Sequence, residues 1–234
     1  MTNPPPVIAR ANLWARFFTK ISYPRDLRLV IHAFYKRRRF QVPGETWSIV
    51  DSIGGFLSAK EAGLLHWAAS ESPPGRVLEL GSYEGRSTVV FALAGRHVHA
   101  IDAWSLEVDD LSAYDGGMTS ANSVLDRFKQ NVRRAQVEAQ ISIHRGLTHE
   151  VGRRWNIPGT ILFVDAGHAY ADVKGDLEIW TPHLLPQGLL IMHDVLGDVY
   201  LDVTRVASEL LRQGWRVVAS AGSIVAFTRN AATL

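Results

Sequence analysis

The sequence predicts an α/β fold: a doubly wound, mostly parallel seven-stranded sheet with an antiparallel C-terminal hairpin and an N-terminal helical extension. Three observations favour it. From residue 76 onward, short apolar runs alternate with segments of helical periodicity. The runs are apolar throughout, which is typical of strands buried on both faces of a parallel sheet. The last two runs are separated only by "SAG", which predicts a hairpin.

The first part of the chain is predicted to be helical. Residues 8–21 and 26–40 carry apolar side chains at i, i+3 and i+4 spacing. The stretch "SAKEAGLLHWAA" begins with a capping box, Ser58 and Glu61, so a helix is expected to start there. The turn sequence "SPPG" at 72–75 then ends it.

Strands and helices are expected to alternate after that turn. The strands are expected at 76–81, 97–102, 141–146, 160–165, 188–194, 215–219 and 223–228. The helices are expected at 86–94, 122–135, 171–180 and 202–211. Asp202 is interpreted as the N-cap of the last helix and Gly214 as its C-terminal stop.

Length and composition limit the class of protein. The 234 residues, of which 47% are hydrophobic, suit one large α/β domain or a domain with an appendage. No apolar run approaches the ~18 residues that span a bilayer, and the N-terminus lacks the apolar region of a secretory signal. The absence of cysteine excludes disulfides and thiolate sites. A cytoplasmic location is the simplest expectation.

Charge is distributed unevenly along the chain. Residues 1–41 hold nine Lys/Arg and one acid, for a net charge of +8, whereas the whole chain has +2. Such a segment suits either a nucleic-acid or anionic-membrane patch, or a solvated helix end or arm packed on an acidic subunit. We favour the second interpretation, so no nucleic-acid partner is expected.

The first two predicted strands indicate a nucleoside ligand. "LELGSYEGRS" places Glu79 at a strand end and Gly81 and Gly85 in the following turn, and Asp102 ends the next strand. An acid in that place is suited to bind both hydroxyls of a ribose. The glycine spacing differs from the dinucleotide fingerprint, and Glu79 would repel phosphate. S-adenosylmethionine, which has a cationic amino group and no phosphate, suits this turn. The alternative is a tight turn with a surface acid.

Two later strands each end in an acid and a histidine. "FVDAGHAY" contains Asp165 and His168, and "LLIMHDV" contains His193 and Asp194. Ligands of doubly wound sheets bind at the carboxyl ends of the strands, so these side chains are expected to meet. Separately, Asp165 could cap the next helix, His168 could be a surface residue and His193 a core residue.

The sequence resembles the class I S-adenosylmethionine-dependent methyltransferases, which implies a Rossmann-like methyltransferase fold. "VLELGSYEGRST" is similar to their first motif, "HAIDAW" to the end of their second strand, and the C-terminal hairpin to their reversed seventh strand. The likeness covers about residues 55–230. It implies S-adenosyl-L-methionine as cofactor, bound by Glu79, Gly81, Ser82, Gly85, Ser87, Asp102, Ala103, Trp104 and Asp165.

Within that class, the segment from Asp165 to Asp194 resembles the metal-dependent O-methyltransferases. The resemblance implies a Mg²⁺ ion held by Asp165, His193 and Asp194, although an imidazole is a poor ligand for so hard an ion. His168 stands where the catechol branch has a lysine base and sugar-modifying members have a histidine. The resemblance therefore implies that His168 is the general base and that Asp165 lies at the reaction centre, and it favours the sugar-modifying branch.

The expected function is therefore Mg²⁺-dependent methylation of a hydroxyl on a sugar, glycoside or oligosaccharide. The rival hypotheses are a catechol or phenol acceptor, a nucleic-acid methyltransferase, and a non-enzymatic cofactor-binding scaffold. Residues 55–234 would form the methyltransferase domain. Residues 1–54 would cover the acceptor site or make the contact of a homodimer. Residues 105–118 would form a lid or a plain surface loop, and Trp104 would cover the adenosine or pack in the core. His144 is more simply a packed strand residue than a ligand contact.

Overall fold

The computed structural model describes residues 24–104, 121–197 and 199–229. The predicted helix at 8–21 and the predicted lid at 105–118 lie outside the described residues. No helix in the described ranges has both the length and the apolar character needed to cross a membrane.

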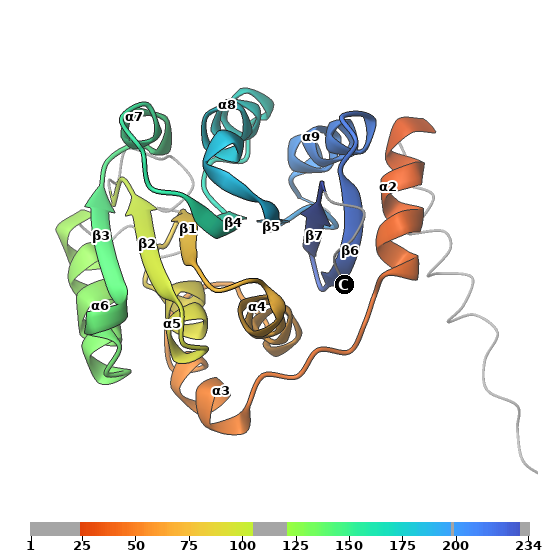
Figure 1. The fold of residues 1–234 in the computed structure, drawn as a ribbon. Coiled ribbons are helices and arrows are strands. Elements are labelled where there is room, and N and C mark those ends of the chain that lie inside the picture. The colour runs from red at the N-terminus through yellow and green to blue at the C-terminus, as the bar shows by residue number, and fades with distance from the viewer. Residues whose placement is uncertain (1–23, 105–120, 198, 230–234) are drawn as a thin grey trace, which may run out of the picture.

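A seven-stranded sheet forms the centre of the molecule, with strand order β3-β2-β1-β4-β5-β7-β6 (Figure 1). The strands are β1 (Arg76–Leu80), β2 (His97–Asp102), β3 (Ile141–Arg145), β4 (Gly159–Val164), β5 (Leu184–Met192), β6 (Arg216–Ala221) and β7 (Ile224–Thr228). β1 to β5 pair in parallel, and β7 is antiparallel to both β5 and β6. This confirms the predicted fold class, including the C-terminal hairpin.

Helices cover both faces of the sheet (Figure 1). On one face lie α3 (Gly44–Val50), α4 (Ala59–Glu71), α5 (Arg86–Leu93) and α6 (Ala121–Arg134). On the other face lie α7 (Thr148–Gly152), α8 (Tyr170–Trp180) and α9 (Leu201–Arg212), and α2 (Pro24–Tyr35) lies beside β6 at the edge. Two short 3₁₀ turns complete the described elements, η1 (Glu138–Gln140) and η2 (Thr181–His183).

Strands buried on both faces explain the uniformly apolar runs. In β1, Val77 packs in the core cluster beneath α4 and α5, whereas Leu78 packs in the cluster beneath α8 and α9. β4 is buried along its whole length. Successive residues of a strand point to opposite faces of the sheet. Where helices cover both faces, the residues on each face must therefore be apolar.

The predicted start of α4 is confirmed in detail. The Ser58 side chain accepts from the backbone of Glu61, and the Glu61 side chain accepts from the Ser58 N–H, which makes the expected capping box. The connection from α4 to β1 is held by Arg96, whose guanidinium donates to carbonyl groups in residues 69–75. The glycine stop is also found, because α9 ends just before Gly214, which has φ +88°.

Two local predictions were wrong. α2 ends at Tyr35 instead of continuing to residue 40, because the chain then pairs with the edge strand: Arg37 forms a parallel bridge with Ser220 of β6. An edge strand offers unpaired backbone groups, and these compete with continued helix. Asp202 is not the N-cap of α9, since Tyr200 holds that position, and the Asp202 carboxylate instead accepts from the Tyr170 N–H. The short helices α3 and α7 were not predicted.

Candidate active site at the carboxyl edge of the sheet

The ends of β1, β2, β4 and β5 meet at one edge of the sheet, and the backbone there is unusual. Tyr83, Trp104 and Asp194 all have positive φ, at 46°, 42° and 56°. Such conformations cost free energy in residues other than glycine and occur often at functional sites. Each of the three follows one of these strands closely.

Glycine is required in the turn after β1. Gly81 has φ +84°, and a Cβ atom there would lie 2.0 Å from the carbonyl oxygen of Asp165. The turn after β1 therefore touches the turn after β4, which no larger residue would allow. Gly85 has φ +91° and forms the N-cap of α5.

Glu79 is wholly buried and anchors this turn from within. Its carboxylate accepts hydrogen bonds from the hydroxyls of Ser82 (2.8 Å), Ser87 (2.6 Å) and Thr88. Burial raises the pKa of Glu79 to about 7, although the three hydroxyls lower it. Glu79, Ser82 and Ser87 were predicted to contact the cofactor. The structure brings them together as one hydrogen-bonded group, and their contact with the cofactor stays a prediction.

Asp102, at the end of β2, joins two of the strand ends. One carboxylate oxygen accepts from the backbone N–H groups of Ser82 (2.8 Å) and Tyr83 (2.9 Å), and the other accepts from that of Trp104 (2.6 Å). It therefore shapes the turn in which the cofactor is expected to lie. Its predicted contact with the ribose hydroxyls is not tested by these bonds, because each carboxylate oxygen can accept more than one.

Trp104 is buried, with 3% of its surface exposed. Its indole N–H donates to the Tyr83 carbonyl oxygen, and its ring packs edge-on against Phe128. Ala103, the residue before it, is half-buried, and its carbonyl oxygen accepts from Arg145 Nε at 3.4 Å. One side of the Trp104 ring therefore packs in the hydrophobic core. Its contact with the adenosine stays a prediction.

The acid–histidine pairs of β4 and β5 do meet. Ligand atoms of Asp165, His168 and Asp194 all lie within 4.8 Å of one another. β4 and β5 are parallel neighbours, and their register pairs Val164 with Met192, the residues just before these pairs. His168 Nε2 lies 3.2 Å from Asp194 Oδ2. An ionised carboxylate only accepts, so Nε2 carries the hydrogen and Nδ1 is left as the acceptor.

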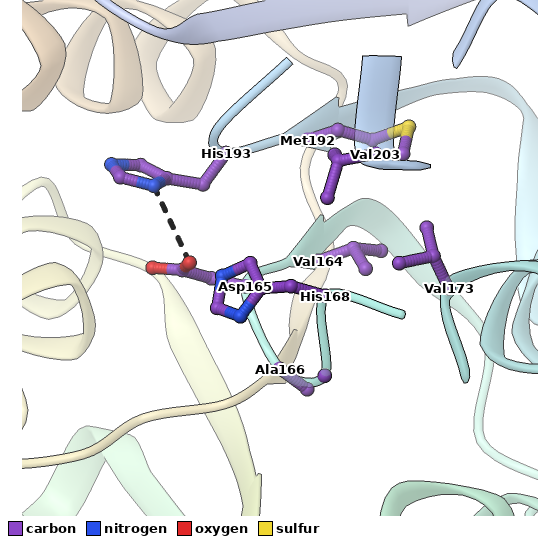
Figure 2. A pocket seen from close by; sticks show the side chains of 9 residues that line it. Val164, Asp165, Ala166, His168, Val173, Met192, His193 and Val203 are labelled. Carbon is purple, nitrogen blue, oxygen red and sulfur yellow. Dashed lines mark ion pairs between the residues drawn. The ribbon is translucent and has the colours of Figure 1, made fainter. Parts of the chain in front are cut away.

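His193 stands between the two carboxylates rather than beside them. Its Nδ1 lies 3.4 Å from Asp165 Oδ1, the contact drawn in Figure 2, and 3.1 Å from Asp194 Oδ2. Its other nitrogen, Nε2, lies 4.0 Å from Glu61 Oε1. His193 was predicted as a metal ligand, whereas the cluster of ligand atoms found in the structure contains His168 in its place.

Charges in this group are strongly coupled. Burial raises the pKa of Asp165 to about 6, while His193 lowers it and Asp194 raises it. Burial alone would lower the pKa of His193, but Asp165, Asp194 and Glu61 raise it to about 9. Burial would raise the pKa of Asp194, but the hydrogen bond from His168 and the adjacent ring of His193 hold it well below its ordinary value. Asp194 is thus the firmly ionised member.

A small pocket opens over this group. Asp165, His168 and His193 supply its polar side, and Figure 2 shows aliphatic side chains on the other side. These are Val164, Val173, Met192 and Val203.

The donor set fits a divalent cation. The two carboxylates could supply part of an octahedral shell, with water completing it. His168 Nδ1 could either bind the cation or accept a proton, but one lone pair cannot do both. The carboxylates suit Mg²⁺ or Mn²⁺, and an imidazole is better tolerated by Mn²⁺. His193, if protonated, competes with a cation for the same two carboxylates.

Two residues of the site, Tyr200 and Glu61, were not predicted from the sequence. Tyr200 stacks face to face on His168, with ring centroids 3.7 Å apart and an interplanar angle of 15°. Glu61 was recognised only as a capping residue, yet it reaches His193. No local signal marks either contact, because both join segments that are distant in the sequence.

His144 does not lie with this group. Its Nε2 is 3.0 Å from His99 Nδ1, and its ring packs on Trp155. This is the arrangement of a packed strand histidine.

The comparisons with known proteins agree with this architecture. A family model described as "Methyltransferase domain" matches residues 78–195, half of the chain. The uncharacterized protein y4gI of Sinorhizobium fredii is 27% identical over 139 residues, which are 55% of this chain but only 14% of that protein's length.

Solved structures show the same fold. A candidate caffeoyl-CoA O-methyltransferase from Staphylococcus aureus superposes with a TM-score of 0.60 at 19% identity, covering 88% of this chain and 99% of that chain. CalS11, a TDP-rhamnose 3'-O-methyltransferase of calicheamicin biosynthesis, has a TM-score of 0.52 at 15% identity, covering 87% and 92%.

The sheet order, the reversed last strand and the glycine turn after β1 define the fold of the class I S-adenosylmethionine-dependent methyltransferases. Since the family model spans half of its residues, the chain belongs to the methyltransferase domain family.

Proposed function

We propose that the protein transfers a methyl group from S-adenosylmethionine to a hydroxyl of a sugar, glycoside or oligosaccharide, with a divalent cation, Mg²⁺ or Mn²⁺, bound at the carboxyl edge. The observation that carries the proposal is the meeting of Asp165, His168 and Asp194 within 4.8 Å at the ends of two adjacent parallel strands. This group lies directly beside the turn after β1, where Gly81 touches Asp165.

Each residue has a chemical role in this reaction. Asp165 and Asp194 would hold the cation, which supplies Lewis-acid chemistry that lowers the pKa of an acceptor hydroxyl. His168, oriented by Asp194 through Nε2, accepts the hydroxyl proton on Nδ1. The acceptor oxygen forms its bond to the methyl carbon as the carbon–sulfur bond breaks, and the electron pair stays on sulfur. Positioning supplies most of the acceleration, because the sulfonium is already reactive.

The acceptor class rests on His168. A histidine at this position matches the sugar-modifying branch of the family resemblance, and a lysine would match the catechol branch. The structural neighbours include a caffeoyl-CoA enzyme, whose acceptor is phenolic, and a sugar enzyme, so fold alone does not separate the two.

The test is a transfer assay with methyl-labelled S-adenosylmethionine. The acceptor panel contains nucleoside-diphosphate sugars, simple glycosides and oligosaccharides, with catechol and caffeoyl compounds as rivals. We expect label in the sugar class, loss of turnover in EDTA, and recovery with Mg²⁺ or Mn²⁺. Full activity in EDTA would refute the metal role, and label only in catechols would favour the rival acceptor.

Variants separate chemistry from cofactor binding. Asp165→Asn and Asp194→Asn are expected to lower turnover by a factor of about 100 or more while S-adenosylmethionine still binds. Asp172→Asn is a suitable control, since Asp172 lies in the first turn of the adjacent helix α8 and outside the cluster. Equal losses in all three variants would contradict the proposed site.

A further inference from the structure

We propose that Glu61 is a positioning residue for the reaction: acting through Ser223 and His193, it holds Asp194 in the conformation that presents its carboxylate at the candidate active site. The catalytic part of this inference depends on the proposed function. The structural part, the control of Asp194 by Glu61, does not.

Glu61 is a buried carboxylate, 5% exposed, with four hydrogen-bond donors directed at it. Oε2 accepts from the backbone N–H (2.8 Å) and the hydroxyl (2.7 Å) of Ser58. Oε1 accepts from the backbone N–H (2.7 Å) and the hydroxyl (2.9 Å) of Ser223. The capping of α4 explains only the bonds to Oε2. The bonds to Oε1 reach the turn between β6 and β7, which is 162 residues away.

That turn is built around the Glu61 carboxylate. A Cβ atom on Gly222 would lie 2.2 Å from Glu61 Oε1, and Gly222 has φ +58°. A Cβ atom there would force the Glu61 side chain to move, so the turn closes directly over the acid. A helix cap on the protein surface would not need such a fit.

Ser223 passes the constraint to the backbone of Asp194. While its hydroxyl donates to Glu61, its oxygen accepts from the Asp194 N–H at 3.4 Å. Its carbonyl oxygen also accepts from the Leu196 N–H at 3.0 Å. Asp194 has φ +56°, a left-handed conformation that a residue with a side chain adopts at a cost. The surrounding bonds must hold it there.

His193 passes a second constraint to the side chains. Its ring lies between Glu61 on one side, 4.0 Å from Nε2, and the carboxylates of Asp165 and Asp194 on the other, 3.4 and 3.1 Å from Nδ1. The ring is 7% exposed and packs edge-on against Phe163. Figure 2 shows a nitrogen of the ring directed toward the Asp165 carboxylate. Glu61 therefore lies against the far side of the ring whose Nδ1 contacts both carboxylates.

A matched pair of serine variants tests the inference. Ser223→Ala removes one hydroxyl from Glu61 together with the acceptor for the Asp194 N–H, whereas Ser58→Ala removes the equivalent hydroxyl on the capping side. We expect Ser223→Ala to lower kcat and Mn²⁺ affinity by roughly ten-fold with the KM for S-adenosylmethionine almost unchanged. Ser58→Ala is expected to lower the Tm while retaining kcat and Mn²⁺ affinity. Mn²⁺ binding to the protein without substrates is measured by calorimetry.

Glu61→Gln is the second variant. An amide has one acceptor oxygen, so it cannot accept from the backbone N–H groups of both Ser58 and Ser223. Crystal structures of the wild type, Glu61→Gln and Ser223→Ala report φ of Asp194 and the orientation of His193 directly. We expect both to change in the variants, and this readout requires neither metal nor turnover.

The outcomes are distinct. The inference is overturned if Asp194 and His193 keep their wild-type conformations in both variants, or if Ser58→Ala lowers Mn²⁺ affinity and kcat as much as Ser223→Ala. A wild type that neither binds Mn²⁺ nor transfers methyl groups would refute the proposed function, and the conformation of Asp194 in the variants would still decide the role of Glu61.

Discussion

Replacing Glu79 by glutamine is expected to stabilise the protein at alkaline pH and to remove a pH dependence of its stability. Glu79 is wholly buried, and burial raises the pKa of its carboxyl group from an ordinary value of 4.5 to about 7. The folded protein thus holds this proton to higher pH than the unfolded chain does. The contribution of this proton to the stability is fully present below about pH 4.5 and is lost as the pH rises through about 7.

The magnitude follows from the shift. One pKa unit corresponds to about 1.4 kcal/mol, so a shift of about 2.5 units gives a loss of about 3 kcal/mol above pH 7. Of this, about 2.5 kcal/mol falls between pH 5 and pH 8. Glutamine cannot ionise, so the variant escapes the loss. Any change in hydrogen bonding to Ser82, Ser87 and Thr88 adds an offset that does not depend on pH.

The assay is urea unfolding of wild type and Glu79→Gln at several pH values. The quantity of interest is the free energy of unfolding of the variant minus that of the wild type. This difference should increase by about 2.5 kcal/mol from pH 5 to pH 8. Glu71→Gln makes the same chemical change at an exposed position of α4 and serves as control. A difference that stays constant with pH would refute the reasoning, whatever its sign.

Four further predictions concern the candidate site and the packing of the chain. His168→Ala should lower kcat by a factor of about 10² to 10⁴. Tyr200→Phe keeps the stacked ring and should retain the activity that Tyr200→Ala loses. Equal activity of the two Tyr200 variants would show that stacking on His168 is unimportant. Gly81→Ala should prevent folding or abolish cofactor binding, because its Cβ would lie 2.0 Å from the Asp165 carbonyl oxygen; a normal Tm with normal binding of S-adenosylmethionine in calorimetry would contradict this. Arg96→Ala should lower the free energy of unfolding by about 3 kcal/mol, since it removes the donor of two buried and two partly buried hydrogen bonds to carbonyl groups. A loss of less than about 1 kcal/mol in denaturant unfolding would argue against it.

Much of the fold could be predicted because its signals are local. Continuous apolar runs identified all seven strands, although the strand predicted at 188–194 spans Leu184–Met192, and the capping box located the start of α4. Boundaries were less predictable. α2 stops early because its continuation, near Arg37, pairs with an edge strand formed by residues near the other end of the chain.

The candidate site was predictable in composition and less so in geometry. Strand-end acids are visible in the sequence, since parallel strands place their carboxyl ends together. The sequence does not reveal that His168 contacts Asp194 or that His193 lies between two carboxylates. Side-chain direction after a strand depends on the backbone of the turn, and Asp194 adopts an unusual left-handed conformation there.

The amino-acid sequence by itself determined the seven strands, most of the helices and the identity of the polar residues at the strand ends, because each depends on neighbours a few positions away. The tertiary structure decided which of those residues meet and what supports them. Glu61 is a capping residue in the sequence and a partner of Ser223 and His193 in the folded chain. The difference arises because contacts between distant segments depend on strand order and register, which no short stretch of sequence specifies.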